Sequence, residues 1–263
     1  MGATVVCTDS TSLLAPAAAT QLGVDVVPLH IALDGEPFDG ETDDFYARMR
    51  AGAVASTSQP SPAEFAATYA QAAAKGAERV LSFHLDARVS GVAGSAELAA
   101  ADASVAVDVI ALETVSYGVA VCVRAAAIAL RTGASAPAAV ASAQETAGAL
   151  DNVFATRASS GRVSAPDDVW AVLRFADGRA ETLSTHATRD GAVEAMTRRV
   201  AAHPMPIAMA VGHAAREVEA PADAFAHALL GFASVRAVER YRVEPSVGAH
   251  SGADSFGAFL WRV

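Results

Sequence analysis

The chain has 263 residues, of which 52% are hydrophobic and 18% charged, and its formal net charge is −10. This length suits one large domain or two moderate ones. The negative charge argues against nucleic acid or an anionic membrane surface as a partner. Cys7 and Cys122 are too few for a disulfide framework and lie in apolar segments, so we expect buried free thiols.

Strands and helices alternate through the first 150 residues. Apolar runs predict strands at 3–8, 24–29, 78–85 and 105–112. Helices are predicted at 16–22, 43–50, 61–75, 91–103, 117–131 and 137–150, and most of these segments except 43–50 are rich in alanine. An extended excursion with a turn at Asp34-Gly35 is expected at 31–38. This alternation is typical of βαβ units around a parallel sheet.

The pattern changes after residue 150. Strands are predicted at 153–157, 169–175, 180–184, 207–212, 235–243, 246–249 and 256–262, with helices at 190–202 and 220–230. Asp177-Gly178 is a hairpin turn signal, which implies antiparallel pairing. We therefore expect an α/β protein of two domains, 1–150 and 151–263.

Hydroxyl-rich segments precede two of the predicted helices. They are Thr57-Ser58-Gln59-Pro60-Ser61 and Ser90-Gly91, and the second follows a strand at the carboxyl edge of the sheet. A helix N-terminus attracts anions, so two such ends could hold one carboxylate without Lys or Arg. Taken singly, each Ser or Thr is explained as well by an ordinary N-cap role.

An ordered set of short motifs resembles the DegV family of bacterial fatty-acid-binding proteins. The set comprises Thr8-Asp9-Ser10, Pro28-Leu29, Thr57 to Ser61, Ser90-Gly91, Ser95-Ala96, Gly161-Arg162-Val163-Ser164, Asp177-Gly178, Thr188-Arg189 and His250-Ser251-Gly252. The resemblance covers essentially the whole chain. It implies an N-terminal α/β/α domain with a parallel sheet, which carries the head-group loops, and a C-terminal α/β domain with a mixed sheet, which closes a lipid cavity.

The resemblance also implies a function. A long-chain fatty acid is the expected ligand, with no cofactor, no metal and no catalytic residue. Its carboxylate is expected at Thr57 and Ser90, with Ser58, Gly91 and His250 in the same lipid-binding set. Family members deliver the acid to a separate kinase that makes acyl-phosphate for lipid synthesis, and Arg162 and Arg189 match positions that face this partner.

The sequence departs from the family pattern in several places. Val92-Ala93 replaces the usual Thr-Tyr, and Glu113-Thr114 replaces Asp-Ser. The Ile-Lys-Pro segment after Gly-Arg-Ile-Ser is missing, and the final Gly-Pro-Gly reads Gly252-Ala253-Asp254. These changes affect the expected cavity and partner surface, so lipid binding is better supported than kinase partnership.

Three other functions compete. A serine hydrolase of small acyl substrates would use Ser90 or Ser10 as nucleophile, His250 as base and Asp9 as acid, but the G-x-S-x-G elbow is missing. A nucleotide-using enzyme is the second alternative, but no P-loop and no G-x-G-x-x-G motif follows the first strand. A small-acid binder with a narrowed pocket is the third. No basic leader and no uninterrupted apolar stretch of about 18–20 residues is evident, so we expect a cytoplasmic protein without integral membrane association.

Overall fold

The computed structural model describes residues 3–157 and 168–262. The chain forms two compact units, and both are discontinuous in sequence. The first unit consists of Met1–His30 and Ser58–Gly148, and the second of Ile31–Thr57 and Ala149–Val263. The second unit resumes close to the expected boundary near residue 150, but it also takes in Ile31–Thr57, which the sequence division assigns to the first domain.

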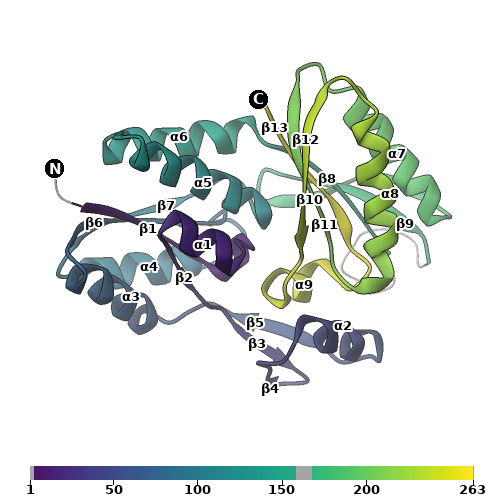
Figure 1. Ribbon diagram of the computed structural model, residues 1–263. Helices are drawn as coiled ribbons and strands as arrows, with labels where there is room; N and C mark the ends of the chain where they lie inside the picture. The colour runs from purple at the N-terminus through teal and green to yellow at the C-terminus, as the bar shows by residue number, and fades with distance from the viewer. Residues whose placement is uncertain (1–2, 158–167, 263) are drawn as a thin grey trace. The chain divides into compact units, whose positions relative to one another are not determined.

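The first unit contains a four-stranded parallel sheet with helices on both faces (Figure 1). The strand order is β2 (Val24–Val27), β1 (Ala3–Asp9), β6 (Ala77–His84) and β7 (Ala106–Ala111), and all neighbours are parallel. One face carries α3 (Pro62–Ala74) and α4 (Val92–Ala101), and the other α1 (Pro16–Leu22), α5 (Tyr117–Arg131) and α6 (Ala136–Ala149). The expected α/β/α arrangement is confirmed.

The central strands are buried because helices cover them from both sides. Leu81 and Phe83 of β6 are fully buried, and Val6 and Cys7 of β1 are also buried. Cys122 is buried in α5, and both thiols are free, as the sequence predicts. Burial raises the pKa of each thiol to about 12.

The second unit contains a six-stranded mixed sheet. Its order is β10 (Arg179–His186), β9 (Trp170–Ala176), β8 (Asp151–Arg157), β13 (Phe256–Arg262), β11 (Ile207–His213) and β12 (Val235–Arg242). Only the pair β11–β12 is parallel in this sheet. The core lies between the sheet and helices α7 (Arg189–Ala201) and α8 (Glu219–Leu230), where Met196, Met209 and Phe225 are fully buried. The mixed sheet and the Asp177-Gly178 hairpin turn are confirmed.

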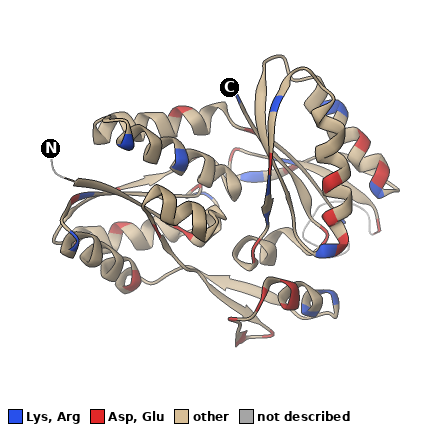
Figure 2. Cartoon of the chain, viewed as in Figure 1, with Lys and Arg blue, Asp and Glu red and all other residues tan. Residues whose placement is uncertain are grey.

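The excursion forms a small sheet and a helix. Strands β4 (Glu36–Pro37), β3 (His30–Leu33) and β5 (Ala55–Ser58) pair in that order, with α2 (Thr42–Arg50) between β4 and β5 in sequence. Figure 2 shows acidic residues at the start of α2 and basic residues at its end, which complements the helix dipole. Within the second unit, Tyr46 of α2 donates a 2.7 Å hydrogen bond to the Val243 carbonyl.

Helix α2 also forms ion pairs with the C-terminal part of the second unit. Asp43 pairs with Arg242 at 2.7 Å and with Arg216, and Arg50 pairs with Asp254 at 2.5 Å. These contacts and the Tyr46 hydrogen bond explain why residues 31–57 belong to the second unit although they precede most of the first.

The expected strand at 246–249 is wrong. This segment lies in α9 (Pro245–Ser251), where Pro245 occupies the first turn and Glu244 is the N-cap. Proline at the first helical position has a φ already suited to the helix and has no N–H to leave unpaired. Two short 3₁₀ helices complete the described chain, η1 (Ser10–Ser12) and η2 (Arg216–Val218). No helix within 3–157 and 168–262 is both long and apolar enough to span a bilayer.

Candidate functional site

The carboxyl edge of the parallel sheet carries the loops that the sequence singles out. Strand β1 ends at Asp9 and continues into η1, and β6 ends at His84 and leads to Ser90-Gly91 before α4. In η1, Asp9 accepts a hydrogen bond from Thr11 N, and Ser10 Oγ accepts one from Leu29 N at 2.9 Å. Asp9 and Ser10 therefore shape the first strand-to-helix turn.

The entrance of α3 already contains a carboxylate. Ser61 Oγ accepts a hydrogen bond from Glu64 N, and the Glu64 carboxylate accepts one from Ser61 N at 2.7 Å, which completes a capping box. His30 Nε2 lies 3.0 Å from the same carboxylate. The Ser61 N–H, the Ser61 hydroxyl and His30 lower the Glu64 pKa to about 2. A second anion at this helix end would be repelled by Glu64.

The entrance of α4 is different. Its N-cap is Gly91, which has no side chain to cap the helix. The first turn holds no acidic residue, and the hydroxyl of the half-buried Ser90 accepts a long, 3.4 Å hydrogen bond from Val92 N. A hydroxyl therefore stands beside the positive end of a ten-residue helix that lacks its own anion.

Thr57 and His250 meet within the second unit. Thr57 Oγ1 lies 2.8 Å from His250 Nε2, which places the final residue of the segment Ile31–Thr57 against α9. Thr57 lies in β5, and Ser58 is the exposed end of the same strand. The direction of this hydrogen bond follows the imidazole tautomer: when Nε2 carries the proton, the Thr57 hydroxyl hydrogen is available to a ligand.

The two arginines of the expected partner surface have different outcomes. Arg189 is exposed at the first position of α7, 4.0 Å from Asp190, and Thr188 caps that helix through Gly191 N. Arg162 lies outside the described residues. The structure describes no group of three or more His, Cys, Asp or Glu side chains suited to a metal ion.

Sequence reasoning missed a buried polar chain in the first unit. Asp9 Oδ2 lies 2.6 Å from His84 Nδ1, His84 Nε2 lies 2.8 Å from Ser82 Oγ, and Tyr69 donates to Ser82 at 2.9 Å. Asp9, His84 and Ser82 are fully buried. This hydrogen-bonded network has the Asp–His–Ser order of a hydrolase triad, but its serine is buried away from solvent.

This buried chain also bears on the hydrolase hypothesis. One oxygen of Asp9 bonds to His84 and the other to Thr11 N and Thr11 Oγ1, so both oxygens are engaged within the first unit. Asp9 is therefore not available as the acid that would orient His250. The signal that could have revealed the network is the Ser-x-His spacing on β6, since residues two apart on a strand share one face.

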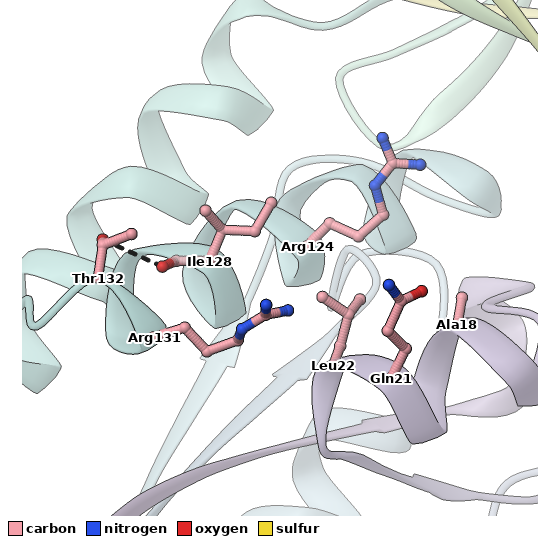
Figure 3. Close-up of a pocket in the computed structure, with 7 residues that line it drawn as sticks. All are labelled: Ala18, Gln21, Leu22, Arg124, Ile128, Arg131 and Thr132. Carbon is pink, nitrogen blue, oxygen red and sulfur yellow. Dashed lines mark hydrogen bonds between the residues drawn. The ribbon is translucent and has the colours of Figure 1, made fainter.

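A groove lies between α1 and α5 of the first unit (Figure 3). It has a volume of about 500 Å³ and is lined by Ala18, Gln21, Leu22, Arg124, Ile128, Arg131 and Thr132. Its two guanidinium groups come from α5, and Arg124 donates to Tyr117 Oη at 3.2 Å. None of the hydroxyl residues expected at a lipid head group lines it.

Comparisons with known proteins match the whole chain. The family model described as "Uncharacterised protein, DegV family" matches residues 3–262. A DegV domain-containing protein of Streptomyces coelicolor is 29% identical over 276 residues, 97% of each chain. One from Deinococcus radiodurans is 44% identical over 137 residues, which is 50% of this chain and 48% of that relative, so this match spans about half of its length.

Solved structures share the fold. The structure described as "Fatty Acid Binding of a DegV family Protein from Thermus thermophilus" superposes with a TM-score of 0.86 at 26% identity and covers 99% of both chains. DegV of Bacillus subtilis, described as a fatty acid binding protein, superposes with a TM-score of 0.86 at 22% identity over 100% of both chains, and at this identity it shows the fold alone. With a family model matched from one end of the described chain to the other, and with this fold, the protein belongs to the DegV family.

Proposed function

We propose that this protein binds a long-chain fatty acid without transforming it. In this proposal Ser90 and Gly91 of the first unit, and Thr57, Ser58 and His250, contact the carboxylate, while apolar side chains enclose the tail. The acid is then presented to a separate kinase for acyl-phosphate formation.

The observation that carries the proposal is the contrast between the two helix entrances. The α3 entrance is filled by Glu64, whereas the α4 entrance offers Ser90 and a helix end that lacks an anion. Backbone N–H groups and a hydroxyl suit a carboxylate. The Thermus thermophilus relative, described by its fatty acid binding, supports the same ligand class.

The energetics of such a complex favour a division of roles. Burying about sixteen carbons is worth roughly 0.8 kcal/mol per CH₂, on the order of 11–12 kcal/mol before the cost of immobilising the chain. A charge-assisted hydrogen bond from a hydroxyl adds about 1.5–3 kcal/mol when it is desolvated. The tail therefore supplies most of the affinity, and the hydroxyls orient the head group.

Substitution of the hydroxyl residues tests this division. We expect Thr57→Ala and Ser90→Ala to impair head-group placement and transfer more than lipid retention. Thr188→Ala is the matched control, because Thr188 caps α7. Its loss should cost about 1 kcal/mol of stability without changing lipid binding. Complete loss of bound lipid in both Thr57→Ala and Ser90→Ala would contradict the division.

The ligand class itself is tested by mass spectrometry of a denaturing solvent extract of the purified protein. The expected result is one long-chain acid in a stoichiometric amount. A clean extract, combined with failure to take up added palmitic acid, refutes the proposal.

Presentation to a kinase needs its own experiment. The loaded protein is mixed with a fatty acid kinase subunit and ATP, and acyl-phosphate is trapped with hydroxylamine. We expect Arg189→Ala to slow trapping while the lipid content stays constant. Arg198→Ala is the control, because Arg198 lies on the same helix and is paired with Glu194 at 2.7 Å. Equal trapping rates for both variants would show that Arg189 is not part of the partner surface.

A further inference from the structure

The segment between β5 and α3 is attached to the first turn of α4 through Gln59. Gln59 Nε2 donates a 2.8 Å hydrogen bond to Ser95 Oγ. Ser95 is 3% exposed, and its own N–H donates to the Gly91 carbonyl at 3.1 Å. One side chain therefore joins the loop before α3 to the first turn of α4, and both lie within the first unit.

A side chain at Gly91 would meet the Gln59 amide in its observed position. A Cβ at Gly91 would lie 2.4 Å from Gln59 Oε1, 3.3 Å from Cδ and 3.4 Å from Nε2. The backbone of Gly91 has φ −80° and ψ 7°, a conformation open to residues other than glycine. The glycine is thus explained by the amide group packed directly against it, and not by its own backbone.

We propose that Gln59 is a positioning residue for the fatty-acid head group. Its amide fixes the backbone at Gly91 and so sets where the preceding Ser90 hydroxyl stands at the uncapped end of α4. This inference rests on the proposed function. It assigns Gln59 no contact with the ligand, because its amide nitrogen is engaged by Ser95 and its oxygen lies against Gly91.

The test compares palmitic acid with 1-hexadecanol, which has the same chain length but no carboxylate, by displacement of a fluorescent fatty acid. The wild-type protein should prefer palmitic acid. We expect Gln59→Ala to reduce this preference about fivefold, the effect of one displaced hydrogen bond, while the affinity for hexadecanol stays unchanged. Equal losses for both ligands would indicate a structural role alone and overturn the inference.

The buried partner of Gln59 gives the second arm. Ser95→Ala should reduce the preference as Gln59→Ala does, and the double variant should show no further loss, because both changes remove the same attachment. If Ser95→Ala leaves the preference intact while Gln59→Ala lowers it, Gln59 contacts the carboxylate itself and the positioning role is refuted.

The steric arm uses Gly91→Ala. In the wild-type background the new methyl group must displace the Gln59 amide, so the preference for palmitic acid should fall. In the Gln59→Ala background the methyl group has space, and Gly91→Ala should have no additional effect. Additive effects would overturn the inference. A wild-type protein that binds neither ligand would instead refute the proposed function, so the two failures are distinguishable.

Discussion

Replacing Asp9 should be among the most damaging single changes in the first unit. Its Oδ1 accepts hydrogen bonds from Thr11 N at 2.9 Å and from Thr11 Oγ1 at 2.5 Å, and its Oδ2 lies 2.6 Å from His84 Nδ1. Asp9 and His84 are both fully buried. Asp9→Ala removes these acceptors and leaves the imidazole without its partner in a region closed to water.

The magnitude follows from this burial. Each buried donor left without its acceptor costs about 1–3 kcal/mol, so removing the acceptor of Thr11 N, Thr11 Oγ1 and His84 should cost about 3–5 kcal/mol, a large part of the roughly 5–15 kcal/mol that stabilises a typical domain. At about 2–4 °C per kcal/mol for chains of 150–250 residues, the melting midpoint should fall by roughly 6–20 °C. Asp9→Asn should be intermediate, because one amide oxygen replaces two acceptor oxygens.

Urea and thermal unfolding followed by circular dichroism provide the assay. Asp102→Ala is the control, since Asp102 is an exposed aspartate at the end of α4 and should change stability by less than about 0.5 kcal/mol. The double variant Asp9→Ala/His84→Ala should lose less than the sum of the two single losses. An Asp9→Ala protein within about 1 kcal/mol of wild type would show that the buried pair contributes little, and the reasoning would fail.

Two further predictions concern titratable groups. The pKa of Glu64 is lowered to about 2 in the folded protein, so the stabilisation from its capping box is complete above about pH 4.5 and is lost as the pH falls toward 2. Because the side chain is 36% exposed, the effect is about 1 kcal/mol. It is measured as the unfolding free-energy difference between wild type and Glu64→Gln, and a difference that stays constant from pH 7 to pH 2 would contradict the assignment. Burial raises the pKa of Cys7 and Cys122 to about 12, so iodoacetamide at pH 8 should label neither thiol in the native protein and both after denaturation; rapid native labelling would show that they are accessible.

The sequence predicts most elements of the fold because their apolar patterns are long. Strand β6 and helix α5 are identified by long apolar runs in the sequence, and most residues of these runs are buried in the structure. The local pattern predicts short segments less well. Residues 246–249 have the pattern of a strand, although Pro245 begins the seven-residue helix α9. The discontinuous second unit is invisible to local patterns, because it depends on contacts such as Tyr46 with Val243, which are distant in sequence.

The same limit applies to the candidate site. Local motifs single out Thr57, Ser90 and His250 as candidates, and the hydrogen bond between Thr57 and His250 appears only when the chain is folded. The pairing of Asp9 with His84 depends on the β1–β6 register, in which Cys7 stands opposite Ser82, and no local spacing encodes it.

The difference between the two helix entrances, however, can be predicted from the sequence. Ser61-Pro62-Ala63-Glu64 has the Ser-x-x-Glu pattern of a capping box, so α3 brings its own carboxylate to its N-terminus. Ser90-Gly91 is followed by Val92-Ala93-Gly94-Ser95, which supplies no acid to the first turn of α4. A helix whose first turn carries a glutamate has satisfied its own positive end, whereas one that begins with hydroxyl and apolar residues leaves that end for a ligand. Placing a glutamate at the third helical position of α4, three residues after its N-cap Gly91, by Gly94→Glu should therefore lower palmitic acid binding while hexadecanol binding persists. Undiminished palmitic acid binding would place the carboxylate away from α4.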